Sequence, residues 1–69
     1  MQTISELAGE AQSDDPYAAL RAITRLRGEL DRAEAAAVRR ARVAGYSWHL
    51  IALSLGVSKQ AVHRKYGRA

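Results

Sequence analysis

The sequence predicts an all-α protein, in which one long helix is followed by two short helices joined by a tight turn. Two observations support this fold class. Apolar residues recur at intervals of three or four between residues 16 and 44, which is the spacing of a helix face. Further along the chain, Ser47 and Ser58 are each suited to cap a short helix, and Gly56 separates the two segments. The three helices are expected to share one small core.

The length and composition limit how much stability one chain gains from its own core. A chain of 69 residues buries a limited fraction of its surface, and its many alanines bury little apolar area each. It contains no cysteine, so neither a disulfide nor a cysteine-ligated zinc ion can supplement that core. We therefore expect a second subunit to contribute, which predicts a homodimer.

Residues 1–14 allow two interpretations. Thr3 and Glu6 have the spacing of a capping box, and the apolar residues that follow recur at helical spacing, which favours a short helix. Gly9 and the polar residues 12–15 favour a frayed N-terminal arm instead. Both alternatives remain open at the level of the sequence.

A long helix is expected within residues 15–45. Asp15 is suited to the N-cap and Pro16 to the first helical position, where its missing N–H removes no hydrogen bond. Gly45 ends the apolar pattern after about 29 residues, which corresponds to about 43 Å of helix. The last turns should pack against the short helices through small side chains. These are Ala37, Val38, Ala41 and Ala44.

The earlier turns of this helix carry an apolar stripe that the short helices cannot reach. The stripe consists of Leu20, Ile23, Leu26 and Leu30. Pairing with the same helix of a second chain would bury it, so we expect dimerisation through the long helix. The alternative is a bend at Gly28, after which the first half of the helix folds back over a four-helix monomer.

Residues 46–69 have the pattern of two short helices. The first is expected from Trp48 to about Leu55 and the second from Ser58 to about Tyr66. Gly56 can adopt the left-handed conformation that turns the chain between them. The apolar residues of this segment are expected to face the shared core. They are Ile51, Ala52, Leu55, Val57, Val62 and Tyr66.

This pattern resembles the helix-turn-helix of bacterial sigma-factor region 4 and of recombinase DNA-binding domains. The residues that carry the resemblance are Ile51-Ala52, Leu55-Gly56-Val57-Ser58, Val62 and Lys65-Tyr66. The chain is most similar to small DNA-binding proteins of actinobacterial type, over residues 39–67. The resemblance implies that residues 58–66 form a recognition helix that enters the major groove of double-stranded DNA.

The charges are distributed unevenly along the chain. Residues 1–34 contain all seven acids and four arginines, which gives a net charge of −3. Residues 35–69 contain seven bases and no acid, which gives +7. Such an asymmetry is typical of a polyanion-binding half. A basic membrane-surface helix would require a continuous bulky apolar face, and the apolar residues of this half are already assigned to a compact core.

The candidate site residues divide into two sets. Base contacts are expected from the outward face of the second short helix, whose side chains offer donors, acceptors and positive charge. These are Lys59, Gln60, His63 and Arg64. Phosphate contacts are expected from Ser47, Ser58, Arg42, Lys65 and Arg68. Capping alone also explains both serines, and Trp48 belongs either to the core or against the sugar-phosphate backbone.

Other classes of function find little support in the sequence. Two histidines without cysteine or a nearby acid make a poor zinc site, and no cofactor is expected. A glycine-rich phosphate loop is absent, as is a nucleophile with a paired base, so we do not expect an enzyme. No apolar run approaches the ~20 residues that span a bilayer, and no signal peptide opens the chain. We expect a cytoplasmic, nucleoid-associated protein.

These observations predict a homodimeric protein that binds double-stranded DNA and regulates transcription. The alternative is a sigma-like interaction module that contacts RNA polymerase or a regulatory protein and does not bind DNA directly. The acid-free basic half of the chain favours DNA.

Overall fold

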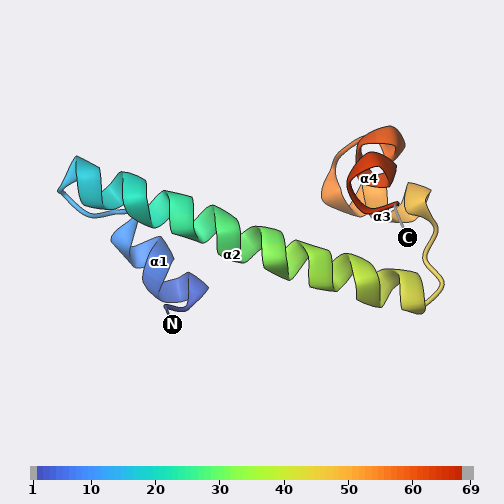
Figure 1. Ribbon diagram of the computed structural model, residues 1–69, viewed down its shortest axis with the longest axis horizontal. Coiled ribbons are helices and arrows are strands. Elements are labelled where there is room, and N and C mark those ends of the chain that lie inside the picture. The colour runs from blue at the N-terminus through green and yellow to red at the C-terminus, as the bar shows by residue number, and fades with distance from the viewer. Residues whose placement is uncertain (1, 68–69) are drawn as a thin grey trace. The chain divides into compact units, whose positions relative to one another are not determined.

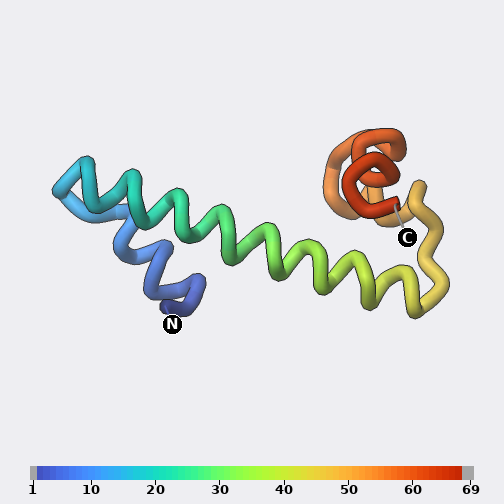
Figure 2. Tube along the Cα trace, viewed as in Figure 1, coloured from blue at the N-terminus to red at the C-terminus, as the bar shows by residue number. Residues whose placement is uncertain are grey.

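A computed structural model describes residues 2–67, and every regular element within them is an α-helix (Figure 1, Figure 2). The helices are α1 (Ile4–Glu10), α2 (Pro16–Val43), α3 (Trp48–Leu55) and α4 (Lys59–Tyr66). The all-α fold class is therefore confirmed for the described residues. The chain divides into two compact units, residues 1–33 and 34–69, and α2 contributes to both. No helix in the described part of the chain is long and apolar enough to cross a membrane.

The N-terminal segment adopts the short helix rather than the frayed arm. The hydroxyl of Thr3 accepts a hydrogen bond from the backbone amide of Glu6 at 3.1 Å. The Glu6 carboxylate in turn accepts one from the backbone amide of Thr3 at 3.4 Å, which completes the capping box. These two bonds satisfy donors that are otherwise unpaired at a helix start.

Within the first unit, α1 packs beside the N-terminal half of α2 (Figure 1). Leu7 and Ala22 are both buried, and the side chain of Arg25 donates a hydrogen bond to that of Gln2 at 3.2 Å. Neither a second subunit nor the short helices are needed to cover this face of α2. The sequence did not predict this packing of α1.

The apolar stripe of α2 is covered only in part. Ile23 and Leu26 are half-buried within the monomer, whereas Leu20 is 65% exposed and Leu30 49% exposed. The helix is continuous through Gly28. The leftover apolar surface is therefore smaller than the sequence predicted, and it is concentrated at Leu20 and Leu30.

Both ends of α2 lie close to their expected positions. The Asp15 carboxylate accepts a hydrogen bond from the Tyr17 amide at 3.1 Å, and Pro16 is the first helical residue. After Val43 the chain turns through Gly45, whose φ of 93° lies in the left-handed region that favours glycine. The turn is closed by a 3.0 Å hydrogen bond from the amide of Gly45 to the carbonyl of Arg42.

The core of the second unit is small and built from three helices. Val38 of α2, Ile51 and Ala52 of α3, and Val62 of α4 are buried together. Ala41, Trp48 and Tyr66 are half-buried and pack against them. The expectation that Val38 and Ala41 face this core is confirmed.

Four residues expected in this core are exposed instead. Ala37 lies about 100° around the helix from Val38, so it points away from the packed face. Ala44 follows the end of α2 and belongs to the turn. Leu55, the last residue of α3, is at the rim of the core, and Val57 is 48% exposed. The Val57 amide bonds to the carbonyl of Ala52 at 3.1 Å, so its backbone is held against α3 while its side chain faces outward.

Candidate nucleic-acid interface

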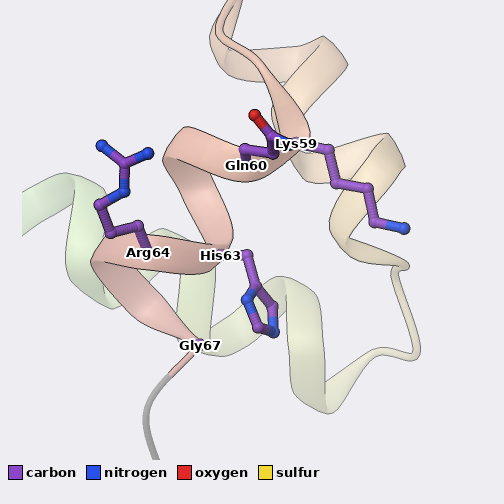
Figure 3. Close-up of a pocket in the computed structure, with 5 residues that line it drawn as sticks. All are labelled: Lys59, Gln60, His63, Arg64 and Gly67. Atoms are coloured by element: carbon purple, nitrogen blue, oxygen red, sulfur yellow. The ribbon is translucent and has the colours of Figure 1, made fainter.

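The outward face of α4 holds the four side chains predicted to contact bases. Ser58 begins the helix, because its hydroxyl accepts a hydrogen bond from the amide of Ala61 at 3.1 Å. From that start, the helix exposes the predicted residues and brings them together around one open depression, which Gly67 also lines (Figure 3). They are Lys59, Gln60, His63 and Arg64. None of them is acidic, so the face is positively charged.

These side chains form two rows along α4. Lys59 and His63 are four residues apart and lie above one another, as do Gln60 and Arg64. Figure 3 shows Lys59 and Arg64 extending to opposite sides of the helix. The two rows therefore present different side chains along α4.

Ser47 and Ser58 both act as N-caps. The hydroxyl of Ser47 accepts from the Leu50 amide at 3.1 Å, and that of Ser58 from the Ala61 amide at the same distance. Each hydroxyl retains one proton that it can donate to an anion. Capping thus accounts for both serines and leaves each able to contact a phosphate.

Arg42 is held in place by two neighbours. One of its guanidinium nitrogens donates to the carbonyl of Tyr46 at 2.9 Å. Its Cζ atom also lies 4.4 Å from the centroid of the Trp48 ring, the geometry of a cation–π contact. Trp48 itself is half-buried and packs on the core, which agrees with the core interpretation of this residue. Arg42 nevertheless remains exposed to solvent.

The structure describes the surroundings of only one of the two predicted phosphate contacts near the C-terminus, Lys65 and Arg68. The Nζ atom of Lys65 lies 3.4 Å from Oε1 of Glu34, so Lys65 already forms an ion pair within the chain. Its Nζ is also 5.3 Å from the centroid of the Tyr66 ring. Arg68 lies outside the described residues. Of the predicted basic contacts, Lys65 is therefore paired with a carboxylate, whereas Arg42 is held by the Tyr46 carbonyl and the Trp48 ring.

Glu34 belongs to the basic unit, which the division of the sequence after residue 34 did not foresee. Residues 34–69 contain seven bases and this one acid, so their net charge is +6. The hydrogen bond from Tyr66 and the charge of Lys65 hold the pKa of Glu34 below its ordinary value. Burial and the bond to the carboxylate raise the pKa of Tyr66. Glu34 therefore stays ionised and neutralises part of the charge of Lys65.

Sequence reasoning also missed a contact between Trp48 and His63. Their rings meet edge to face, with centroids 5.9 Å apart and an interplanar angle of 90°. His63 therefore adjoins the same indole that holds Arg42. No helical period relates positions 42, 48 and 63, and the packing of α2, α3 and α4 in one core brings them together. We call Arg42, Trp48 and His63 the indole cluster.

A metal site finds no support in the described residues. No group of three or more His, Cys, Asp or Glu side chains gathers there in a way that could hold an ion. His49 and His63 are both exposed, and the His63 ring contacts the ring of Trp48.

Comparison with protein-family models, curated proteins and solved structures finds no match to this chain. The likeness to sigma-factor region 4 therefore rests on the residues named for it. A proposal on function rests on the geometry and charge of residues 34–67.

Proposed function

We propose that this protein binds double-stranded DNA, with α3 and α4 as a helix-turn-helix and α4 as the recognition helix in the major groove. The observation that carries the proposal is the outward face of α4, where Lys59, Gln60, His63 and Arg64 are exposed side by side without an acid. Lysine and arginine donate to guanine, and glutamine pairs with adenine in two hydrogen bonds.

The turn between α3 and α4 supports this assignment. Gly56 has φ of 72°, and its amide bonds to the carbonyls of Ala52 and Leu53 at the end of α3. Ser58 caps the next helix two residues later. Ala52 is buried where the two helices pack, and a larger side chain there would force them apart. A short, tightly packed pair of this kind allows the second helix to enter a groove.

Contacts to the DNA backbone would lie around α4. Arg42 and the two capping serines offer donors around α3 and α4, and the net charge of +6 on residues 34–69 attracts the phosphates of either strand. Lys65 can contribute by exchanging its ion pair, and Arg68 is included on its charge alone.

We further propose that the protein acts as a homodimer and regulates transcription. The dimer contact would be the stripe of α2 formed by Leu20, Ile23, Leu26 and Leu30. Leu20 and Leu30 are the exposed members that a second copy would cover. A two-fold pair of recognition helices predicts half-sites about 10–10.5 bp apart, or a multiple of that spacing.

The direct test is the salt dependence of binding to unrelated duplexes, followed by fluorescence anisotropy of a labelled DNA. A dimer that makes about 6–10 phosphate contacts should lose roughly 10³–10⁵ in affinity between 50 and 200 mM salt. A flat dependence, or no binding to any duplex at 50 mM salt, would contradict the proposal.

One observation favours the second candidate, a sigma-like module that binds a protein such as RNA polymerase or a regulator. Leu50 and Leu53 stand one turn apart on the outer face of α3, and Leu53 is 64% exposed. Exposed apolar neighbours of this kind are found at protein contacts. The two functions separate experimentally, because Leu50→Ser with Leu53→Ser should weaken a protein contact and leave binding to bare DNA unchanged.

A further inference from the structure

The indole cluster is a contact that core packing alone does not require. Trp48 packs on the core, and its ring also contacts Arg42 and His63, which are both exposed. Arg42 comes from the last turn of α2 and His63 from the middle of α4. Three elements of the basic unit therefore contribute to one solvent-facing group.

The chemistry of Arg42 in this cluster suits a phosphate. Its guanidinium has five N–H donors in a planar fork, and the bond to the Tyr46 carbonyl uses one nitrogen. The indole and this carbonyl fix the plane of the fork, so less side-chain entropy is lost when it binds an anion. Residues 35–69 hold no acid to occupy the remaining donors. An oxyanion from outside this segment is the fitting partner.

The position of His63 divides the face of α4. The row of Lys59 and His63 adjoins Trp48, because the His63 ring contacts the indole edge to face. Gln60 and Arg64 form the other row. A histidine ring held at the edge of a tryptophan has less freedom to follow base edges, but its N–H can donate to a phosphate oxygen.

We propose that Arg42, Trp48 and His63 form one binding site for a phosphodiester group of the DNA backbone. In this site Arg42 and His63 donate to the phosphate, and Trp48 is a positioning residue that orients both. Base reading then belongs to Gln60 and Arg64. The inference rests on the proposed function and assigns a ligand group to one part of the interface.

The test begins with the wild-type chain, because Trp48 is its single tryptophan. Its fluorescence should change on addition of a duplex, by the same amount for preferred and unrelated sequences, and the change should be reversed by salt. Binding that leaves the emission unaltered would overturn the site.

Substitutions then distinguish a residue that contacts the phosphate from a residue that contacts bases. His63→Ala should weaken preferred and unrelated duplexes by the same factor, roughly tenfold or more, because a hydrogen bond to a charged phosphate is lost. Arg64→Ala, one residue away on the same helix, is the matched control and should change the ratio between the two duplexes. If His63→Ala changes that ratio, His63 reads bases and the inference is wrong.

A double-mutant cycle tests the role of Trp48. If the indole positions Arg42, then Trp48→Leu should add little to the loss caused by Arg42→Ala, because the contact is already gone. Independent effects that multiply would contradict a positioning role. Trp48 also packs on the core, so its replacement can disturb the fold. A second cycle therefore combines Arg42→Ala with His63→Ala, two changes that retain the indole. The helicity of each variant is measured by circular dichroism.

These measurements distinguish a failure of the phosphate site from a failure of the proposed DNA-binding function. If the wild type binds DNA with a steep salt dependence but its tryptophan emission does not respond and the cycles are additive, the indole cluster is not a phosphate site and the proposed function stands. If no duplex is bound at low salt, both are wrong.

Discussion

The hydroxyl of Tyr66, the last residue of α4, donates a hydrogen bond to the carboxylate of Glu34 on α2. Lys65 forms an ion pair with the same carboxylate. Because Ser58 caps the other end of α4, the proposed recognition helix is held at both ends. The single acid of residues 34–69 thus fixes the orientation of α4 while taking up part of the charge of Lys65.

This contact predicts how stability depends on pH. The hydrogen bond from Tyr66 holds the pKa of Glu34 below its ordinary value of 4.5. A carboxyl group with a lowered folded-state pKa stabilises the fold above its unfolded pKa, and this contribution is lost as the pH falls through the folded pKa. Tyr66→Phe should therefore lower Tm at pH 7, by up to about 4–8 °C for a bond worth about 1 kcal/mol.

The difference in Tm between wild type and Tyr66→Phe should shrink as the pH falls through the lowered pKa of Glu34 and its carboxylate becomes protonated. Thermal unfolding followed by circular dichroism at pH 7 and pH 3 measures it. Tyr46→Phe is the control, because the Tyr46 side chain is exposed and forms no contact with Glu34. An equal effect of Tyr66→Phe at both pH values would show that the contribution of Tyr66 does not depend on the ionised carboxylate of Glu34.

Two glycine substitutions compare a position with strained, left-handed backbone with a position inside a regular helix. A Cβ atom at Gly56 would meet nothing within 4 Å, but the residue has φ of 72°, where L side chains are strained. Gly56→Ala should therefore destabilise the protein by about 1–2 kcal/mol. Gly28→Ala is the matched control: it meets only the flexible end of Arg32 at 3.8 Å within a helix, and should stabilise by about 0.5–1 kcal/mol. Urea unfolding of both variants tests the contrast, which is lost if both change stability in the same direction.

The local parts of this fold could be predicted because their signals are local. The capping box at Thr3, the start at Asp15-Pro16 and the left-handed turn at Gly56 each depend on residues within a few positions. Helix caps and turns act through hydrogen bonds and steric effects over that range, so the local sequence is enough to predict them.

The contacts between distant residues could not be predicted in this way. Tyr66 and Glu34 are 32 positions apart, and no periodicity links them. The indole cluster likewise depends on how α2, α3 and α4 pack, and α1 covers part of α2 although its own pattern is weak. The periodicity also predicted that Ala37 faces the core, but Ala37 is exposed and Val38 is buried. Neighbouring residues of a helix point about 100° apart, so both cannot face the centre of the core.

Base reading makes a further prediction on α4. Gln60→Ala and Arg64→Ala should each cost about 1–3 kcal/mol on the preferred sequence and relax the preference at one or two positions. The preferred sequence comes from selection out of a random pool, repeated with each variant. Arg42→Ala is the control, which should weaken all sequences alike. If the triple change of Gln60, His63 and Arg64 to alanine leaves the selected sequence unchanged, α4 is not the recognition helix.

The dimer prediction follows from the two exposed leucines of α2. Leu20 and Leu30 leave much of their apolar surface in water, whereas complete burial of such a side chain contributes roughly 1.5–3 kcal/mol. Leu20→Asp with Leu30→Asp should therefore separate the subunits and preserve the monomer, since neither side chain is buried within it and exposed substitutions change stability by about 0.5 kcal/mol or less. The pair is preferable to changes at Ile23, because Ile23 is half-buried within the chain and its replacement by Asp would unfold the monomer.

Sedimentation equilibrium at micromolar concentration should give twice the 7.6 kDa chain mass for wild type and for the control Leu53→Asp, and 7.6 kDa for the double variant. Specific DNA binding should then fall far more than non-specific binding, because only a dimer engages both half-sites. A wild-type chain that sediments as a folded 7.6 kDa monomer would show that α2 does not form the dimer contact.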